Sequence, residues 1–321
     1  MRSARYRPVL LWLAVATAAT ALLPIVVGSL VTTLDAGMAF SDWPSSDGQG
    51  MLSYPWLKSA GDKFVEHGHR LAGIVIGCVS IVFAVSTWLL EPRRWVRWCA
   101  VGVLLAVVAQ GLLGGGRVLA DARLLAMFHG AFAAAVFAFM SSVALVLSRS
   151  WIEPPRAPVE APTATLKFLA GVTPLVIVVQ YSLGGRVRHL GTGLYEHFGM
   201  AFVVLLCVTA TIIAAHRTRC GWLRRPAYLM GGVALSQLIL GGAAWVTKFG
   251  LPSIGYVAVQ RSLPQIAVRT SHTVVGMLLL MTSVILLFRV LRIASIRRVA
   301  QSPIERPLSP LAPAGLKGSL T

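Results

Sequence analysis

The stretch Gln110-Gly-Leu-Leu-Gly-Gly-Gly-Arg117 closes a long apolar segment of this 321-residue chain. Related stretches, Gln180-Tyr-Ser-Leu-Gly-Gly-Arg186 and Gln237-Leu-Ile-Leu-Gly-Gly242, close two later segments, and a weaker copy runs from Gly28 to Gly37. A histidine follows each copy, near the start of the next apolar segment: His69, His129, His197 and His272. The repeated unit is an apolar segment, an exit of small residues, a loop, a histidine and a second apolar segment. Four such units predict two similar four-helix halves.

Composition defines the class of protein. The chain is 56% hydrophobic and 12% charged, with a mean hydropathy of +0.74, whereas soluble proteins carry about 25% charged residues. Eight apolar stretches reach the roughly 20 residues that a helix needs to cross the hydrocarbon core. The eight expected spans are residues 9–33, 66–90, 96–117, 124–148, 166–187, 194–215, 226–247 and 268–291. The expected fold is an all-α integral membrane protein whose eight transmembrane helices form two pseudo-symmetric four-helix bundles.

The net charge of +18 indicates membrane topology rather than nucleic-acid binding. Most of the 29 basic residues lie in the two tails and in the loops on the N-terminal side, so the positive-inside rule places both termini in the cytoplasm. The first apolar run is longer than the roughly 7–15 residues of a signal-peptide core, so we expect it to remain as a span. Because no Arg- and Ser-rich presequence precedes it, a bacterial plasma membrane is favoured over an organelle.

The chain divides into four expected parts. Residues 1–150 form the N-terminal half and residues 166–292 form the C-terminal half. Between them, residues 151–165 include the Pro-rich stretch from Glu153 to Pro162, which suits a semi-rigid cytoplasmic linker. The polar tail, residues 293–321, is expected to be cytoplasmic and disordered.

The four histidines share one expected position. Because the spans alternate in direction, each histidine lies at the outer end of an even-numbered span, and each half holds two. Imidazole is a common axial ligand of haem iron, so the pairs His69/His129 and His197/His272 predict two bis-histidine haem sites near the outer face. A lone histidine at a helix end is more often an interfacial polar residue, but four in register favour ligands. Zinc, the rival metal, would need tight Cys/His spacings that the sequence lacks.

Glu66 breaks the symmetry between the two pairs. It precedes His69 by three residues and so shares its helix face, whereas Glu196 directly precedes His197 and does not. A carboxylate beside iron can exchange protons during an oxidation. The alternative is an interfacial acid paired with Arg70 or with a lysine of the loop, and the sequence leaves both interpretations open. One pair is therefore expected to be reactive and the other to carry electrons or stabilise.

Arginines and glycines close the repeated stretches on the outer side. Arg117 and Arg186 are candidate ligands of haem propionates, with Arg70 and Arg188 as further candidates, because guanidinium groups suit carboxylates. Snorkelling of each arginine to the interface is the alternative. The glycine pairs either let helices pack closely or let a flat macrocycle approach the backbone.

The first outer loop is long and polar. Residues 35–63 include Asp42-Trp43-Pro44, and the loop is interpreted either as a lid over the first-half site or as a plain connector. His67 is expected to face away from His69, and His189 is expected in the loop between the fifth and sixth spans. Neither histidine has an assigned role.

Together, these residues resemble the heme A synthase family from about residue 10 to residue 291. The phrase Glu66-x-x-His69-Arg70 is the more specific part, and Asp42-Trp43-Pro44 is also similar to the family's loop. The resemblance implies an oxidoreductase that converts the C8 methyl group of heme O to a formyl group by successive hydroxylations, giving heme A for terminal oxidases. The implied catalytic residues are Glu66, His69 and His129. The implied iron ligands of a haem b cofactor in the second half are His197 and His272.

One departure from the family concerns the first outer loop. Many members carry a cysteine pair that flanks the Asp-Trp-Pro motif, whereas the stretch from Ala39 to Ser46 contains no cysteine here. A loop disulfide is therefore not expected to contribute to reduction or to substrate handover.

Two other functions require the same paired histidines. One is a non-catalytic b-type membrane cytochrome that transfers electrons, and the other is a haem carrier or assembly factor. The expected partners are heme O, membrane lipid and an electron donor that the sequence does not identify, and nucleic acid is not expected. Further candidate partners are the farnesyltransferase that forms heme O, terminal oxidase assembly factors and a second copy of the chain.

Overall fold

The computed structural model describes residues 5–153 and 162–301 and contains no β-strand in these ranges. Eight long helices are apolar enough to cross a membrane. They are α1 (Pro8–Leu34), α2 (Gly61–Leu90), α3 (Arg94–Leu119), α4 (Arg123–Leu147), α6 (Ala164–Leu190), α7 (Leu194–His216), α8 (Gly221–Phe249) and α9 (Leu263–Gln301). Three short elements complete the set: η1 (Trp56–Lys58), α5 (Arg149–Ile152) and η2 (Pro252–Ile254). The predicted all-α membrane fold with eight spans is confirmed.

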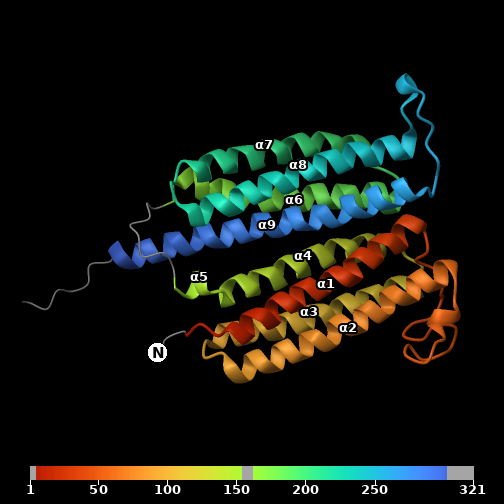
Figure 1. The fold of residues 1–321 in the computed structure, drawn as a ribbon, viewed down its shortest axis with the longest axis horizontal. Helices are drawn as coiled ribbons and strands as arrows, with labels where there is room; N and C mark the ends of the chain where they lie inside the picture. Colours follow the sequence, from red (N-terminus) through yellow and green to blue (C-terminus); the bar gives the residue numbers. More distant parts are fainter. Residues whose placement is uncertain (1–4, 154–161, 302–321) are drawn as a thin grey trace, which may run out of the picture.

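The helices form two four-helix bundles (Figure 1). In the first half, α1 contacts α2 and α4, while α3 contacts α2 and α4; in the second half, α6 contacts α7 and α9, while α8 contacts α7 and α9. Between the halves, α4 contacts α6 and α9, and α1 contacts α9. The last helix of each half thus meets the first and last helices of the other half. This contact pattern is compatible with the expected pseudo-symmetry.

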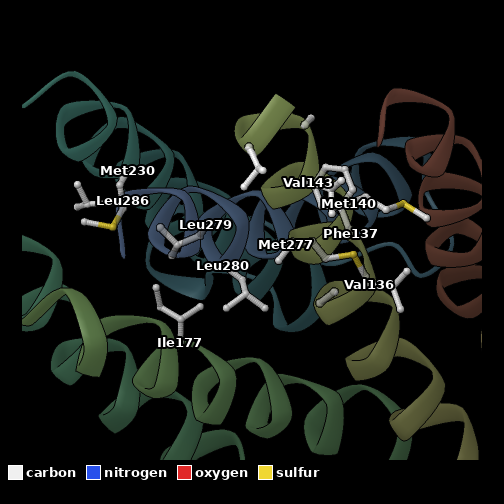
Figure 2. Close-up of a cluster of buried hydrophobic side chains, with 14 of the residues drawn as sticks. Val136, Phe137, Met140, Val143, Ile177, Met230, Met277, Leu279, Leu280 and Leu286 are labelled. Carbon is white, nitrogen blue, oxygen red and sulfur yellow. The ribbon is translucent and has the colours of Figure 1, made fainter. Parts of the chain in front are cut away.

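The seam between the halves is the best-buried part of the molecule. Apolar side chains of α4 and α9 interdigitate there, including Phe137, Met140, Met277 and Leu280, with Ile177 of α6 beside them (Figure 2). These five residues are each at most 5% exposed. Because lipid tails are as apolar as these side chains, close packing rather than exclusion from water holds the halves together.

The ends of the helices differ from the expected span ends in two places. Helix α6 continues to Leu190, so His189 lies in its last turn rather than in a loop. Helix α9 continues to Gln301, so the first part of the expected disordered tail is helical instead. The rest of that tail, residues 302–321, lies outside the described residues, as does the Pro-rich stretch 154–161 of the expected linker.

The long loops lie at one end of the bundle, and the start of the first helix and the end of the last helix lie at the other. Figure 1 shows the start of α1 and the end of α9 at one end, with the loops 35–60 and 250–262 at the other. The four helices that carry the histidines near their starts, α2, α4, α7 and α9, also begin at the end with the long loops. The architecture therefore places all four at the end of the molecule that carries the long loops.

Replacing Phe137 with alanine is expected to loosen the seam. The side chain is 4% exposed, and its removal leaves a cavity that lipid does not fill, so Phe137→Ala should lower the unfolding free energy by roughly 3 kcal/mol, the low end for a buried phenylalanine. The measurement is unfolding in mixed micelles. Phe202→Ala on α7 is the matched control, because Phe202 is 70% exposed and should cost little. Equal losses in the two variants would contradict this account of the seam.

Candidate functional site: two histidine pairs on one cavity

The structure brings the four histidines together as two pairs, one in each half. His69 of α2 and His129 of α4 have ring centroids 6.2 Å apart, with an angle of 86° between the ring planes. His197 of α7 and His272 of α9 have ring centroids 6.4 Å apart, with an angle of 83°. The pairing expected from the repeat is therefore present in the structure, with nearly the same geometry in both halves.

Each histidine ring packs against one glycine of the preceding helix. A Cβ atom added to any of these glycines would lie between 2.6 and 3.1 Å from the ring's Cε1 atom. The contacts are Gly28 with His69, Gly114 with His129, Gly184 with His197, and Gly241 with His272. Real Cβ atoms hardly ever approach so closely, so a side chain at these positions would displace the ring. These glycines thus make room for the histidine itself, which neither interpretation of the glycine pairs anticipated.

The packing also orients the ring nitrogens. In each of the four contacts, the Cε1 and Nδ1 atoms of the ring lie closer to the glycine's Cβ position than Nε2 does. The Nδ1 atoms of His69, His197 and His272 are buried without a hydrogen bond. Metal-bound histidines commonly turn one nitrogen toward protein oxygen and present the other to the metal. In all four rings Nε2 is the nitrogen farther from the glycine.

Glutamines at the start of the repeated stretches flank the rings. The Gln110 side chain donates to the backbone carbonyl of His129 at 3.0 Å and lies 3.2 Å from its Nδ1. The Gln237 side chain lies 3.4 Å from Nε2 of His272. The Oε1 atoms of Gln110, Gln180 and Gln237 are all buried without a donor. Sequence reasoning gave these glutamines no role, although their spacing of four residues before a ring-contacting glycine was a usable signal.

Both pairs open on one cavity of about 1600 Å³ that extends through the interiors of the two bundles. This exceeds the roughly 300–1,000 Å³ of a typical small-molecule pocket, so there is room for more than one large ligand. In residues 5–153 and 162–301, no three His, Cys, Asp or Glu side chains converge on a point that could hold a metal ion. Each pair thus supplies two ligands only. A metal that brings the rest of its ligands in a flat macrocycle fits this donor set.

Five arginines line the cavity. Arg70 is paired with Glu66 and Arg123 is exposed, which leaves Arg117 of α3, Arg188 of α6 and Arg269 of α9. Arg117 donates to the carbonyl of Gly37 at 2.6 Å. None of the three has a carboxylate within 4 Å in the described part of the chain. Arg186 is exposed and does not line the cavity, so the structure does not bring it to the histidines. The cations available to acidic groups of a ligand are therefore Arg117, Arg188 and Arg269.

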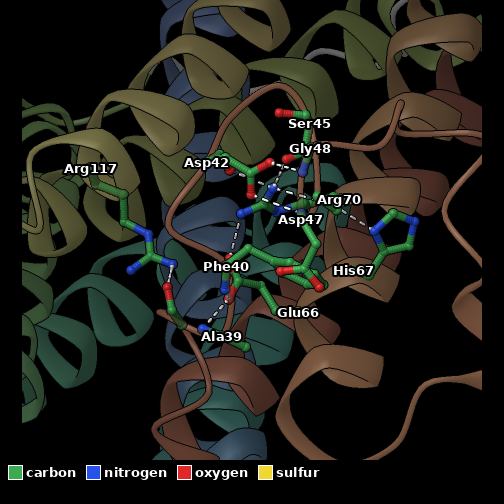
Figure 3. Close-up of polar contacts among 12 residues, drawn as sticks. Ala39, Phe40, Asp42, Ser45, Asp47, Gly48, Glu66, His67, Arg70 and Arg117 are labelled. Atoms are coloured by element: carbon green, nitrogen blue, oxygen red, sulfur yellow. Dashed lines mark hydrogen bonds and ion pairs between the residues drawn. The ribbon is translucent and has the colours of Figure 1, made fainter.

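Glu66 is buried and holds the first outer loop (Figure 3). Its Oε1 accepts from Arg70 at 2.8 Å, and its Oε2 accepts from the N–H groups of Ala39 at 2.7 Å and Phe40 at 3.3 Å. Arg70 donates in turn to the carbonyl of Asp42 at 2.9 Å. Glu66 also lines the cavity beside His69. The ion pair with Arg70, the alternative left open by the sequence, is therefore present, and the carboxylate still borders the site.

The loop covers the first-half part of the cavity. Trp43 lies so close to Gly115 of α3 that a Cβ there would fall 2.2 Å from its indole ring. Trp43 and Pro44 both line the cavity. Inside the loop, Asp42 accepts from the backbone N–H groups of Asp47 at 3.1 Å and Gly48 at 2.8 Å (Figure 3). The geometry favours a lid over a plain connector.

The remaining two candidate histidines take different positions. His67 is fully buried under the loop, with its Nδ1 3.0 Å from Ser46 Oγ and its ring beside Phe40 and Tyr54. It faces away from the cavity, as expected for a residue two positions from His69. His189 lines the cavity from the last turn of α6.

Fold and site define an integral membrane protein of eight helices that presents two histidine pairs to one interior cavity. Residues 57–198, which include the first pair and His197, match the cytochrome oxidase assembly protein family COX15-CtaA. This match and the relatives below confirm the resemblance to the heme A synthase family seen in the sequence.

Three relatives illustrate the similarity, and each is named a heme A synthase. The protein of Chelativorans sp. (strain BNC1) is 32% identical over 139 residues, covering 41% of this chain and 37% of the relative. That of Methylobacterium radiotolerans is 31% identical over 148 residues, covering 42% and 40%. That of Symbiobacterium thermophilum is 29% identical over 192 residues, covering 56% and 59%. The chain thus matches between about two fifths and three fifths of these relatives' length. No solved structure matches the chain.

Adding a methyl group at Gly114 is expected to displace His129. In Gly114→Ala the new Cβ would lie 2.9 Å from Cε1 of the ring, so binding of haem at the first pair should fall to the level of a His129→Ala variant. Gly116→Ala is the control, since no atom lies within 4 Å of its Cβ position and Gly116 does not line the cavity. Haem content per purified chain is the measurement. Unchanged haem in Gly114→Ala would contradict the proposed role of this contact.

Acid is expected to open the Asp42 turn. The N–H of Gly48 lowers the pKa of Asp42 below its usual value, and this outweighs the opposite effect of its slight burial. The stabilisation is therefore complete above the unfolded-state pKa of about 3.9 and is lost as the pH falls through the lower folded-state pKa. Hydrogen exchange of residues 46–49, corrected for intrinsic rates, measures it.

Two variants control that measurement. Asp42→Asn cannot titrate, so its protection should not change with pH in this range. Asp47→Asn removes the exposed ion pair with Lys63 and should keep the acid transition. Loss of protection well above pH 4 in the unmodified protein would show that another group governs the turn.

Proposed function

We propose that this protein is a heme A synthase, an oxidoreductase that converts the C8 methyl group of heme O to a formyl group. The observation that carries the proposal is that two histidine pairs face one cavity. The ring centroids are 6.2 Å apart in the first pair and 6.4 Å apart in the second. These centroid distances leave room for one metal atom between the two rings of a pair, about 2 Å from a nitrogen of each ring. Similarity to the heme A synthase family supports the same reaction.

The first half is the proposed substrate site. There, Gly73, Gly111 and Gly130 border the cavity, and a Cβ on any of them would meet no atom within 4 Å. In the second half, Tyr181 occupies the place in the repeat that Gly111 has in the first, and it lies 3.6 Å from the Cβ position of Gly276. The roomier first half suits a larger macrocycle that enters and leaves. His69 and His129 would bind its iron.

The second half is the proposed resident haem site. His197 and His272 would hold a haem b there, and the tighter surroundings at Tyr181 suit a cofactor that stays bound. Such a haem would supply electrons to the first half. Arg117 and Arg269, which border the cavity, would bind the acidic groups of the macrocycles.

Glu66 is the proposed proton-handling residue. A carboxylate offers about four lone-pair sites, and Glu66 uses three of them, for Arg70, Ala39 and Phe40. One site remains for a proton at the cavity wall beside His69. Oxidation of a methyl group requires controlled proton transfer near the reacting carbon, and a carboxylate held in place as Glu66 is would supply that control. The Asp42-Trp43-Pro44 loop would exclude water from the reaction.

The proposed setting follows from the topology. Both termini would lie in the cytoplasm of a bacterium, with the two sites toward the outer face of the plasma membrane. The proposed partners are heme O, its electron donor, the farnesyltransferase that forms heme O, and assembly factors of the terminal oxidase that receives heme A. Membrane lipid would surround the spans, and a second copy of the chain is a further proposed partner.

Co-expression with a source of heme O tests the function. Pigment extracted from the purified protein is expected to contain heme A together with haem b, and Glu66→Ala should abolish heme A while haem b remains. Glu66→Gln should also abolish it, yet keep hydrogen-exchange protection of residues 39–40, because the amide oxygen still accepts their N–H groups.

The same extraction distinguishes the competing functions. Haem b alone, even when heme O is supplied, would favour a b-type cytochrome, and heme O bound but never oxidised would favour a carrier. Normal heme A formation by Glu66→Gln would restrict Glu66 to anchoring the loop.

A further inference from the structure

Arg188 connects the two halves at the level of the histidines. It lies in the last turn of α6, and its guanidinium donates to Thr273 Oγ1 of α9, to the carbonyl of Ser29 in α1, and to Thr33 Oγ1 at 2.8 Å. Its remaining surface borders the cavity. One side chain of the second half thus holds a helix of the first half and a second helix of its own half.

The partners of Arg188 are next to the histidine contacts of both sites. Ser29 directly follows Gly28, the glycine against which the His69 ring packs. Thr273 directly follows His272. The guanidinium therefore touches the segment that positions one ligand of the first pair and the segment that carries one ligand of the second pair. Two direct hydrogen bonds reinforce this link, since Ser29 Oγ donates to the carbonyl of Thr270 at 3.4 Å and Thr270 Oγ1 donates to Thr33 Oγ1 at 3.3 Å.

The charge of Arg188 is not neutralised by the protein. All its hydrogen-bond partners are uncharged hydroxyl or carbonyl groups, and no carboxylate of the described residues lies within 4 Å. Arg117 and Arg269 also line the cavity and add positive charge. In the protein interior the effective dielectric constant is far below that of water, so such a charge acts strongly on groups nearby.

We propose that Arg188 is a positioning residue shared by both haem sites, whose charge raises the reduction potentials of the irons at both pairs. This rests on the proposed two-haem function. A nearby cation favours reduced iron, which carries one positive charge less than oxidised iron. Because the guanidinium is tied to both segments, both irons are affected by the same charge, and electron flow from the second half to the first does not depend on two separately tuned sites.

Redox titration of the haem-loaded protein tests the proposal. Arg188→Gln removes the charge and is expected to lower both midpoint potentials, whereas Arg188→Lys keeps the charge and should leave both close to the unmodified values. Arg261→Gln is the control, since it removes an exposed outer-side charge that does not border the cavity and should shift neither. A shift in only one midpoint, or in neither, would overturn the proposal.

A second variant serves if Arg188→Gln does not retain haem. Thr273→Val removes the hydroxyl that anchors the guanidinium to α9 while preserving the charge. The guanidinium then stays bound to α1 alone, so the two midpoints are expected to move in opposite directions. Parallel shifts or no shift would contradict a shared charge. An unmodified protein that binds a single haem would instead refute the two-haem function, so the two failures are distinguishable.

Discussion

The contact between a histidine ring and a bare glycine backbone is the interaction on which the site depends. It occurs four times, once in each repeated unit, and the close approach tolerates no side chain at the glycine. Each contact fixes where a ring lies and which nitrogen faces the helix. In each half, two such contacts hold two histidine rings. The ring separation is about the same in both halves, and the ring planes are nearly perpendicular in both. The spacing of the rings is thus set by helix packing.

The two halves repeat the same frame but differ in what surrounds it. In the first half, a loop held by Glu66 and Arg70 covers the cavity, and glycines leave open space beside the rings. In the second half, Tyr181 fills the corresponding space. A repeated ligand frame with unequal surroundings is what a protein needs if one macrocycle is to be altered and another retained. The loop is secured without a disulfide, through the buried Glu66, His67 and Arg70.

The sequence predicted most of the frame, because hydropathy and the repeat are local patterns. The eight spans and the two histidine pairs follow from residue spacing alone. Arg186 and Arg188 show the limit: they are two residues apart on one helix, and only their rotation about its axis decides which reaches the cavity. The sequence favoured Arg186 because it closes the repeated phrase. The ring-contacting glycines and the anchoring of the loop by Glu66 were likewise missed or left open, since both depend on how helices pack.

Electron paramagnetic resonance of the oxidised, haem-loaded protein, combined with haem quantification, tests the central claim most directly. Two haems per chain are predicted, each low-spin with two histidine ligands. Because the ring planes are nearly perpendicular, both signals should be strongly anisotropic. A single haem per chain, or signals typical of parallel imidazole planes in both sites, would contradict the account.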